Sequence, residues 1–259
     1  MSYSITSPSS DTFPGHSASP LHIGIVGCSA EGAALCYRTV CSEGALLLGP
    51  HAHPQISMHT PSLAQYVHCL EASDLAGVAA LMLSSAHKLA AAGADFLICP
   101  DNTIHQAFDQ VSPYSPLPWL HIAQVVAEEA SHRGLRRLGL LGTRWLVNSE
   151  VYPQQLAARG LECVRPVSAQ RDEIGRLIME ELVAGVFQPQ TVSYFQSVIG
   201  TLKAQNCDAV ILGCTEIPLI IDDRNSVLPT LDSTRLLARA ALRHAVARCA
   251  VDADRKLTS

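Results

Sequence analysis

Hydrophobic positions along the chain fall into short unbroken runs separated by longer stretches with helical periodicity. The unbroken runs predict β-strands at 21–27, 96–100, 136–142, 161–166 and 208–213. The periodic stretches predict a helix from just after residue 27 to about 40, and helices at 74–92, 102–111, 121–133 and 143–159. Helical residues also occupy most of 172–206, and the last predicted helix spans 232–250. Apolar strands that alternate with helices are typical of a parallel sheet with both faces covered, so we expect an α/β fold.

Two parts of the chain repeat one another. HIGIVG near the start is similar to RLGLLG at the middle, and ADFLICPD is similar to CDAVILGC. Asp101 and Cys214 therefore hold equivalent positions, each at the end of a buried strand. Any two βαβ units share some pattern by chance, but the equal spacing favours two related halves. Because ligands bind at the carboxyl ends of parallel strands, we expect Asp101 and Cys214 on opposite walls of one cleft.

The repeat predicts two similar halves, each a mostly parallel sheet flanked by helices, that face one another across a cleft. The first domain would comprise residues 21–120 and the final helix at 232–250, and the second residues 121–231. Residues 1–20 are rich in Ser, Thr and Pro and predict a disordered tail. They contain no basic segment and no apolar run, so we do not expect a secretory signal.

Composition disfavours several classes of protein. Hydrophobic residues make up 48% of the chain and charged residues only 16%, which is incompatible with a disordered protein. The net charge of −5 and the scarcity of aromatic residues give no support to a nucleic-acid partner. No apolar run is long enough to span a membrane. The nine cysteines are scattered without disulfide spacing, which favours reduced thiols and a cytoplasmic location.

The segment GCTEIP places Cys214 directly after a buried strand, and a helix is expected to begin just after it. Backbone N–H groups and the helix dipole at such a position favour a thiolate over a thiol. Cys214 is therefore a candidate nucleophile or base. The alternative is a small buried hydrophobic residue, which is the commonest role of a free cysteine.

The segment CPDNTIH offers a second candidate, Asp101, at the equivalent strand end. Asp101 or Asn102 is able to cap the helix that follows, and this is the simpler interpretation. The functional interpretation makes Asp101 a cleft carboxylate, with Asn102 and Thr103 as hydrogen-bond donors to a small anionic ligand. Burial would then raise the pKa of Asp101, as a carboxylate base near neutral pH requires.

Two further motifs concern metals and cofactors. His51, His53 and His59 would share one face of an alternating strand. No fourth ligand accompanies them, so we favour a polar strand face or a cleft lining and expect no metal. The segment from Gly24 to Gly32 departs from G-x-G-x-x-G and lacks a suitably spaced acidic residue, so it gives little support to a dinucleotide cofactor.

These motifs, taken in order, resemble the aspartate/glutamate racemase superfamily. The similar segments are GIVGCSAEG, DFLICPDNTIH, LPWLHIA, LGLLGTRWLVNSEVYPQQL, VILGCTEIPLI and LPTLDST, which cover nearly the whole chain after the tail. The resemblance implies two pseudo-symmetric α/β domains and catalysis without a cofactor. It also implies that one acid/base residue from each domain flanks the substrate, and that the protein is a homodimer, as many members are.

The resemblance carries over to particular residues. Cys214 matches the second catalytic cysteine of the family. Asp101 stands in the place of the first catalytic cysteine, a position where some members carry Thr. Cys99 lies two residues earlier and should point to the opposite face, and Cys28 in the first loop is a weaker substitute. The substrate-binding residues that the resemblance implies are Ser29, Asn102, Thr103, Thr143, Thr215 and Glu216.

The resemblance also bears on the substrate. Aspartate-specific members bind the distal carboxylate with Arg and Lys. The segment HAHPQISMHTPS contains no Arg, and the stretch around Gly185 contains no Lys. His53 and His59 are therefore candidates to bind substrate instead.

We expect a cofactor-independent racemase or epimerase that acts on a small amino acid, with Cys214 and Asp101 on opposite faces of the α-carbon. One alternative is a one-cysteine decarboxylase or a cis–trans isomerase of a small dicarboxylate, because a single thiol suffices for one-sided chemistry. The other is a non-catalytic binding protein that retains the cleft.

Overall fold

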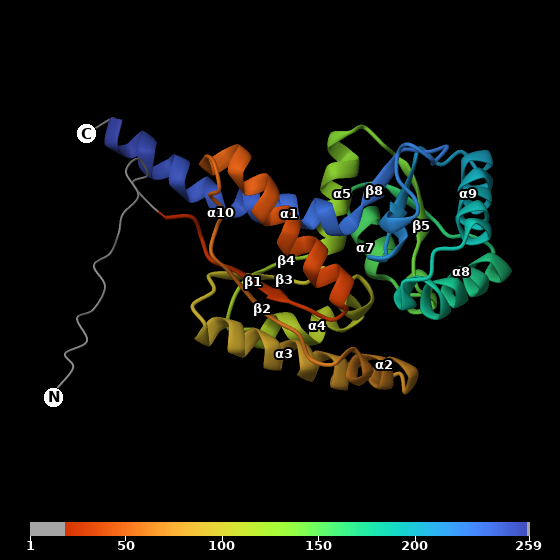
Figure 1. Cartoon of the computed structure of the whole chain (residues 1–259), viewed down its shortest axis with the longest axis horizontal. Coiled ribbons are helices and arrows are strands. Elements are labelled where there is room, and N and C mark those ends of the chain that lie inside the picture. The colour runs from red at the N-terminus through yellow and green to blue at the C-terminus, as the bar shows by residue number, and fades with distance from the viewer. Residues whose placement is uncertain (1–18, 258–259) are drawn as a thin grey trace.

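The computed structural model describes residues 19–257, so the predicted tail lies almost entirely outside the described residues. The chain forms two parallel sheets of four strands each (Figure 1). The first sheet has the order β2-β1-β3-β4, with β1 at Ile23–Val26, β2 at Ile56–His59, β3 at Phe96–Ile98 and β4 at Trp119–Leu120. The second has the order β6-β5-β7-β8, with β5 at Arg137–Leu141, β6 at Glu162–Val164, β7 at Ala209–Leu212 and β8 at Thr230–Asp232.

The two sheets share one strand order, which confirms the predicted pseudo-symmetry. In the first sheet the backbone N–H of His22 donates to the Asp95 carboxylate at 2.7 Å, just before β1. In the second, the backbone N–H of Arg137 donates to the Asp208 carboxylate at 2.9 Å at the start of β5. The repeated acidic residue in the two similar segments therefore has a structural role. It connects the starts of the two central strands of each sheet.

Helices and short 3-10 segments (η) connect the strands. Between β1 and β5 lie α1 (Ala30–Leu48), α2 (Leu63–Glu71), α3 (Leu75–Ala91), η1 (Thr103–Ala107), α4 (Phe108–Val111), η2 (Ser112–Tyr114) and α5 (Ile122–His132). After β5 come α6 (Arg144–Val147), α7 (Val151–Ala157), α8 (Ser168–Glu180), η3 (Leu182–Ala184), α9 (Pro189–Ala204), η4 (Ile217–Leu219) and α10 (Ser233–Leu257).

Alternation along the strands distributes the apolar side chains between three clusters. The outer face of the first sheet packs against α2 and α3, with Leu97 beside Met82. The outer face of the second sheet packs against α8 and α9, with Val210 beside Phe195. The inner faces of both sheets contribute to one central cluster with α1, α5, α7 and α10 (Figure 1). Since α10 follows β8 and packs against α1, the end of the chain returns to the first half.

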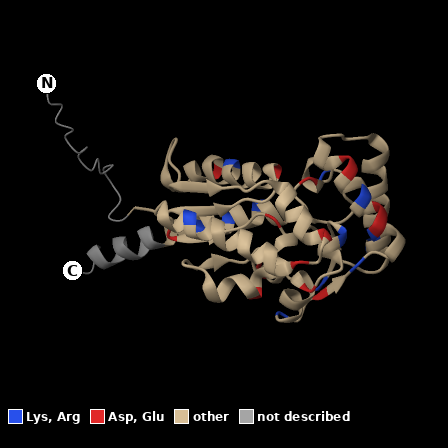
Figure 2. Ribbon diagram, turned by 90° about the horizontal axis from the view of Figure 1, so that it is seen from below, with Lys and Arg blue, Asp and Glu red and all other residues tan. Residues whose placement is uncertain are grey.

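Charged side chains lie mainly on the surface. Figure 2 shows acidic and basic positions interspersed along the ribbon rather than gathered in one region of one sign. The ion pairs, such as Arg176–Glu173 and Arg239–Glu43, involve side chains that are partly exposed to solvent. Exposed pairs of this kind stabilise a fold only slightly. None of the helices in the described part of the chain is both long and apolar enough to cross a membrane.

Candidate active site

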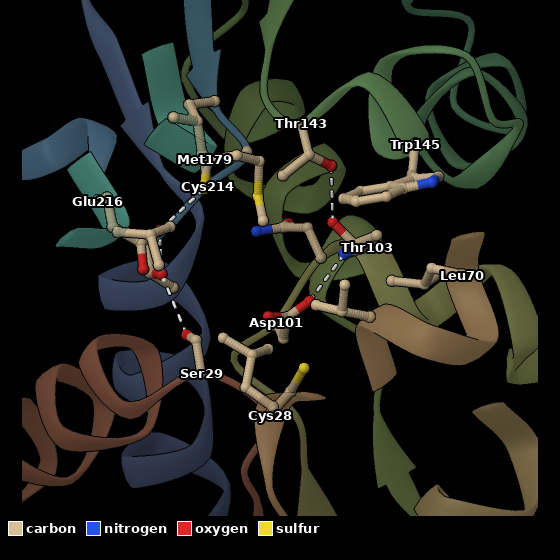
Figure 3. A pocket seen from close by; sticks show the side chains of 17 residues that line it. Cys28, Ser29, Leu70, Asp101, Thr103, Thr143, Trp145, Met179, Cys214 and Glu216 are labelled. Atoms are coloured by element: carbon tan, nitrogen blue, oxygen red, sulfur yellow. Dashed lines mark hydrogen bonds between the residues drawn. The ribbon is translucent and has the colours of Figure 1, made fainter. Parts of the chain in front are cut away.

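A pocket lies where the carboxyl ends of the central strands of both sheets meet (Figure 3). Cys28 and Ser29 follow β1, Asp101 follows β3, Thr143 follows β5 and Cys214 follows β7, and all of them line this pocket. Each half therefore contributes the ends of its two central strands. The pocket occupies the cleft between the two halves, as the repeat predicts.

Two glycines permit the close approach of these segments. A Cβ on Gly213 would lie 2.6 Å from Leu146 and 2.8 Å from the carbonyl oxygen of Leu141. A Cβ on Gly32, at the start of α1, would lie 2.6 Å from the methyl group of Thr215. Real Cβ atoms do not come so close. The segments can therefore approach one another at these two positions only because glycine has no side chain.

Cys214 lies buried on one wall, beside a carboxyl group. Its Sγ donates a hydrogen bond to Oε2 of Glu216 at 2.9 Å, and the hydroxyl of Thr215 donates to the same oxygen at 2.7 Å. Burial of the thiol and the adjacent carboxylate raise the pKa of Cys214 well above its ordinary value. Ser29 caps α1, and its hydroxyl lies 3.3 Å from that of Thr215.

The expectation that Cys214 is a thiolate is therefore wrong, because the pKa of its thiol is raised. The segment after Cys214 is a turn followed by η4, which is only three residues long, so no extended helix dipole points at the sulfur. The carboxyl group of Glu216 acts in the opposite direction, because it accepts a hydrogen bond from the thiol and repels a negative sulfur. Cys214 is held as a thiol that becomes a strong base once it loses its proton.

Asp101 lies half-buried at the end of β3, on a different wall from Cys214 (Figure 3). Its Oδ1 accepts a hydrogen bond from the backbone N–H of Thr103 at 3.0 Å. Burial, and next the carboxylate of Glu216, raise the pKa of Asp101 to about 6, although contact with Cys28 and backbone N–H groups oppose the shift. Asp101 thus both stabilises the turn after β3 and presents a carboxyl group to the pocket.

Cys28, which the sequence suggested only as a weaker substitute for the first catalytic cysteine, also lines the pocket. Its thiol lies next to the Asp101 carboxyl group (Figure 3), and burial together with that carboxyl raises the pKa of Cys28 well above its ordinary value. Cys99 does not line the pocket. It is buried in the outer cluster of the first sheet, with its sulfur 3.7 Å from the carbonyl oxygen of Asp101. The side chains of Cys99 and Asp101 therefore diverge, as the extended segment predicts.

Polar side chains connect the two halves at the pocket. The hydroxyls of Thr103 and Thr143 lie 2.9 Å apart. Asn102 donates to Ser233 at 3.0 Å and accepts from the hydroxyl of Tyr152 at 2.7 Å. Since Tyr152 belongs to α7, which lies between β5 and β6, and Ser233 begins α10, which follows β8, the loop after β3 is attached to elements connected to strands of the other sheet.

The structure brings most of the predicted site residues together. Those that line the pocket are Ser29, Asp101, Asn102, Thr103, Thr143, Cys214, Thr215 and Glu216. His53 and His59 do not line it, which corrects that expectation. Nδ1 of His53 lies 2.8 Å from the carbonyl oxygen of Pro54, and His59 contacts Ser85 and Lys88 on α3.

The sequence missed the apolar side of the pocket. It is formed by α2, α6, α8 and η3, from the side chains of Leu63, Val67, Leu70, Trp145, Ile178, Met179 and Val183. The three residues from α2 are spaced to share one helix face, which is the signal that could have identified this face as buried. Its position beside the pocket has no signature in the sequence.

No three His, Cys, Asp or Glu side chains among the residues that the structure describes are grouped closely enough to hold a metal ion. Two titratable side chains, those of Asp101 and Cys214, lie at equivalent strand ends and line the same pocket as several hydroxyl and amide groups.

Comparisons with known proteins place the chain in a family. The family described as Asp/Glu/hydantoin racemase matches residues 25–241. The chain belongs to the Asp/Glu/hydantoin racemase family. It is an enzyme of the isomerase class, which confirms the resemblance on which the sequence analysis relied.

Relatives of this racemase support the same conclusion. The broad specificity amino-acid racemase RacX of Bacillus subtilis is 27% identical over 164 residues, which are 62% of this chain and 69% of RacX. A provisionally assigned Asp/Glu racemase from Yersinia pestis is 29% identical, with a TM-score of 0.81, over 87% of this chain and 99% of its own. An aspartate racemase homologue from Pyrococcus horikoshii is 27% identical, with a TM-score of 0.75, over 86% and 98%.

Proposed function

We propose that this racemase inverts the α-carbon of an amino acid without a cofactor, by acid/base chemistry from both faces. Asp101 serves one face and Cys214 the other. The observation that carries the proposal is that these two side chains stand at equivalent ends of β3 and β7 and both line one pocket. The broad specificity amino-acid racemase RacX, which resembles this chain, supports the same substrate class.

The two groups start from different protonation states. The pKa of Asp101 is about 6, so this carboxyl is ionised at neutral pH and is able to act as a base. The pKa of Cys214 is raised well above its ordinary value, so this thiol carries its proton and is able to act as an acid. The resting site therefore holds one base and one acid, which is what inversion of one enantiomer requires.

The reaction then runs in two proton transfers. Asp101 takes the α-proton, and the electron pair of the broken Cα–H bond stays on the substrate, delocalised into its carboxylate. The thiol of Cys214 gives its proton to the other face and becomes a thiolate. In the reverse direction the thiolate of Cys214 takes the α-proton and the protonated Asp101 returns one, so the two directions use the same pair of groups.

The substrate carboxylate gains negative charge in the intermediate, so it needs hydrogen-bond donors. Hydroxyl and amide groups from both halves are available in the pocket, from Asn102, Thr103, Thr143 and Thr215. Donors that are already fixed by the fold stabilise a developing charge more effectively than water does. Thr103 and Thr143 are held together by their 2.9 Å contact, and Asn102 by Tyr152 and Ser233.

Replacement of each acid/base group tests the proposal. We expect Cys214→Ser and Asp101→Asn each to lower kcat/KM for racemisation by at least about 100-fold, because general acid/base groups contribute about 10²–10⁴-fold. Chiral chromatography of the D-amino acid formed from the L-amino acid measures the rates. Cys41→Ser and Asp109→Asn, which change the same residue types outside the pocket, serve as matched controls.

Full racemase activity in Asp101→Asn would exclude a two-sided mechanism that uses this carboxyl. Normal amino-acid binding without racemisation by the wild-type protein would favour a binding protein instead. The cytoplasmic location and the homodimer that the sequence analysis expects stay predictions.

A further inference from the structure

The pocket has two chemically distinct sides. Its polar side carries the acid/base pair and the hydroxyl and amide groups. Its other side is apolar and comes from three separate parts of the chain, with Leu63, Val67 and Leu70 from α2, Trp145 from α6, and Ile178, Met179 and Val183 from α8 and η3. We refer to these seven side chains as the apolar wall. Figure 3 shows Leu70, Trp145 and Met179 around the space above Asp101.

The charges around the pocket are all of one sign. Within the described part of the chain, the residues that line the pocket include Asp101 and Glu216 but no Lys, Arg or His. The carboxylate of Glu216 is close enough to raise the pKa of Asp101. A second carboxylate, carried by the substrate's own side chain, would enter this field without a cation to neutralise it. Removing such a group from water without a partner is strongly unfavourable.

Arg144, which precedes Trp145, does not supply the missing cation in this structure. Its guanidinium carbon lies 4.8 Å from the centre of the Trp145 ring, a geometry in which cation and ring attract one another. Arg144 is exposed to solvent and does not line the pocket, whereas Trp145 does. The indole ring therefore presents an aromatic surface to the pocket and holds the charged group of Arg144 by stacking.

We propose that the apolar wall receives the side chain of the substrate, and that this racemase acts on amino acids with uncharged, largely apolar side chains such as Leu, Met and Phe. This inference rests on the proposed racemase function. The backbone groups of such a substrate, its ammonium and its carboxylate, would lie at the polar side, where two carboxyls and several hydroxyls provide partners of both kinds. The side chain would then replace water at the apolar wall.

A substrate panel tests this inference. The full-length protein is incubated with the L-forms of Leu, Met, Phe, Asp, Glu and Arg in D₂O, and NMR follows both loss of the α-proton signal and formation of the D-enantiomer. We expect kcat/KM for the neutral apolar amino acids to exceed that for Asp and Glu by at least about tenfold, the discrimination that even small pocket differences give.

A change in the wall tests the cause of the preference. Met179 is partly exposed at the pocket, so Met179→Lys places a cation there without burying it deeply. We expect this variant to raise the ratio of kcat/KM for Glu to that for Leu by at least about tenfold. Met179→Leu keeps the wall apolar and should keep the wild-type preference. Arg144→Ala should also keep it, because Arg144 does not line the pocket.

The outcomes distinguish failure of this inference from failure of the proposed racemase function. A wild-type preference for Asp or Glu would overturn the inference, and its loss in Arg144→Ala would show that Arg144 binds the distal carboxylate. An unchanged ratio in Met179→Lys, with the variant folded by circular dichroism, would also overturn it. Absence of exchange with every amino acid of the panel would overturn the proposed racemase function itself. Activity confined to the neutral apolar amino acids supports both.

Discussion

Among single residues, Asp101 has a raised pKa that bears directly on the proposed mechanism. Its carboxyl is half-buried and shares the pocket with Glu216, and these two causes raise its pKa to about 6. A cysteine at the same place would need to lose a proton at a much higher pH, whereas Asp101 is already a base at neutral pH. Cys214 keeps its proton because burial and Glu216 act against the thiolate. Burial and Glu216 raise the pKa of both groups, so the asymmetry of the pair follows from the lower ordinary pKa of a carboxyl compared with a thiol.

The raised pKa of Asp101 predicts a pH-dependent cost in stability. The folded protein binds this proton more tightly than the unfolded chain, so the group contributes no penalty below about pH 4. The penalty develops as pH rises from about 4 through 6 and is complete above that range. One pKa unit corresponds to about 1.4 kcal/mol, and the carboxyl is only half-buried, so we expect a penalty on the order of 2 kcal/mol.

Urea unfolding of the wild type and of Asp101→Asn at pH 4 and pH 8 measures this penalty. The variant should gain stability relative to the wild type between the two pH values, because its amide does not titrate. Asp109→Asn, which removes an exposed carboxyl on α4, is the matched control. A difference between wild type and Asp101→Asn that is the same at both pH values would contradict the raised pKa.

Among the elements, segments with a strong apolar pattern follow the sequence prediction, and segments with a weak one do not. The buried strands β1, β3, β5 and β7 and the helices α3 and α5 lie within a few residues of the predicted ranges. The helix after β1 was predicted to end near 40 but continues as α1 to Leu48. Gly44, which suggests an end, instead lets the segment after α1 pack close, because its Cβ would lie 2.8 Å from His53.

Other elements could not be predicted because contacts with distant parts of the chain, rather than their own sequence pattern, determine them. β4 and β8 have only two and three residues, and neighbouring strands define them rather than their own pattern. The predicted helix at 102–111 is a 3-10 segment followed by one turn of α-helix, and the ring of His105 contacts the carbonyl oxygen of Asp101 at 2.8 Å. The polar side of the pocket was predicted because each residue follows a strand, whereas the apolar wall depends on how α2 and α8 pack.

The hydrogen bonds of Asn102 connect the loop after β3 to two helices, and losing one of them should lower the stability of the protein. The hydroxyl of Tyr152 on α7 donates a hydrogen bond to the buried amide oxygen of Asn102. The amide nitrogen of Asn102 in turn donates to the hydroxyl of Ser233 on α10. Tyr152→Phe keeps the ring but leaves that oxygen without a partner, which costs about 1–3 kcal/mol. We expect the free energy of unfolding in urea to fall by this amount.

Tyr114→Phe provides the control for this variant. Tyr114 is 72% exposed, so the loss of its hydroxyl should change stability by no more than about 0.5 kcal/mol. Equal stability of Tyr152→Phe and the wild type would show that the bond to Asn102 does not hold the loop after β3.

Over the whole molecule, the two halves depend on one another in packing and in chemistry. The inner faces of both sheets share one apolar cluster, and α10 returns the end of the chain to the first half. We propose the boundaries 21–120 with 232–250, and 121–231, for the two domains. In the proposed mechanism each half contributes one of the two acid/base groups, Asp101 or Cys214, so neither half alone would invert an α-carbon.

The most direct test of this account is the position of solvent deuterium early in the reaction. An L-amino acid that the enzyme racemises is incubated in D₂O, and at low conversion the two enantiomers are separated and analysed by mass spectrometry. With Asp101 and Cys214 on opposite faces, the D-product carries deuterium at the α-carbon and the recovered L-substrate does not. Deuterium that enters the recovered L-substrate as early as the D-product would mean that a single group serves both faces, and would contradict the two-sided mechanism.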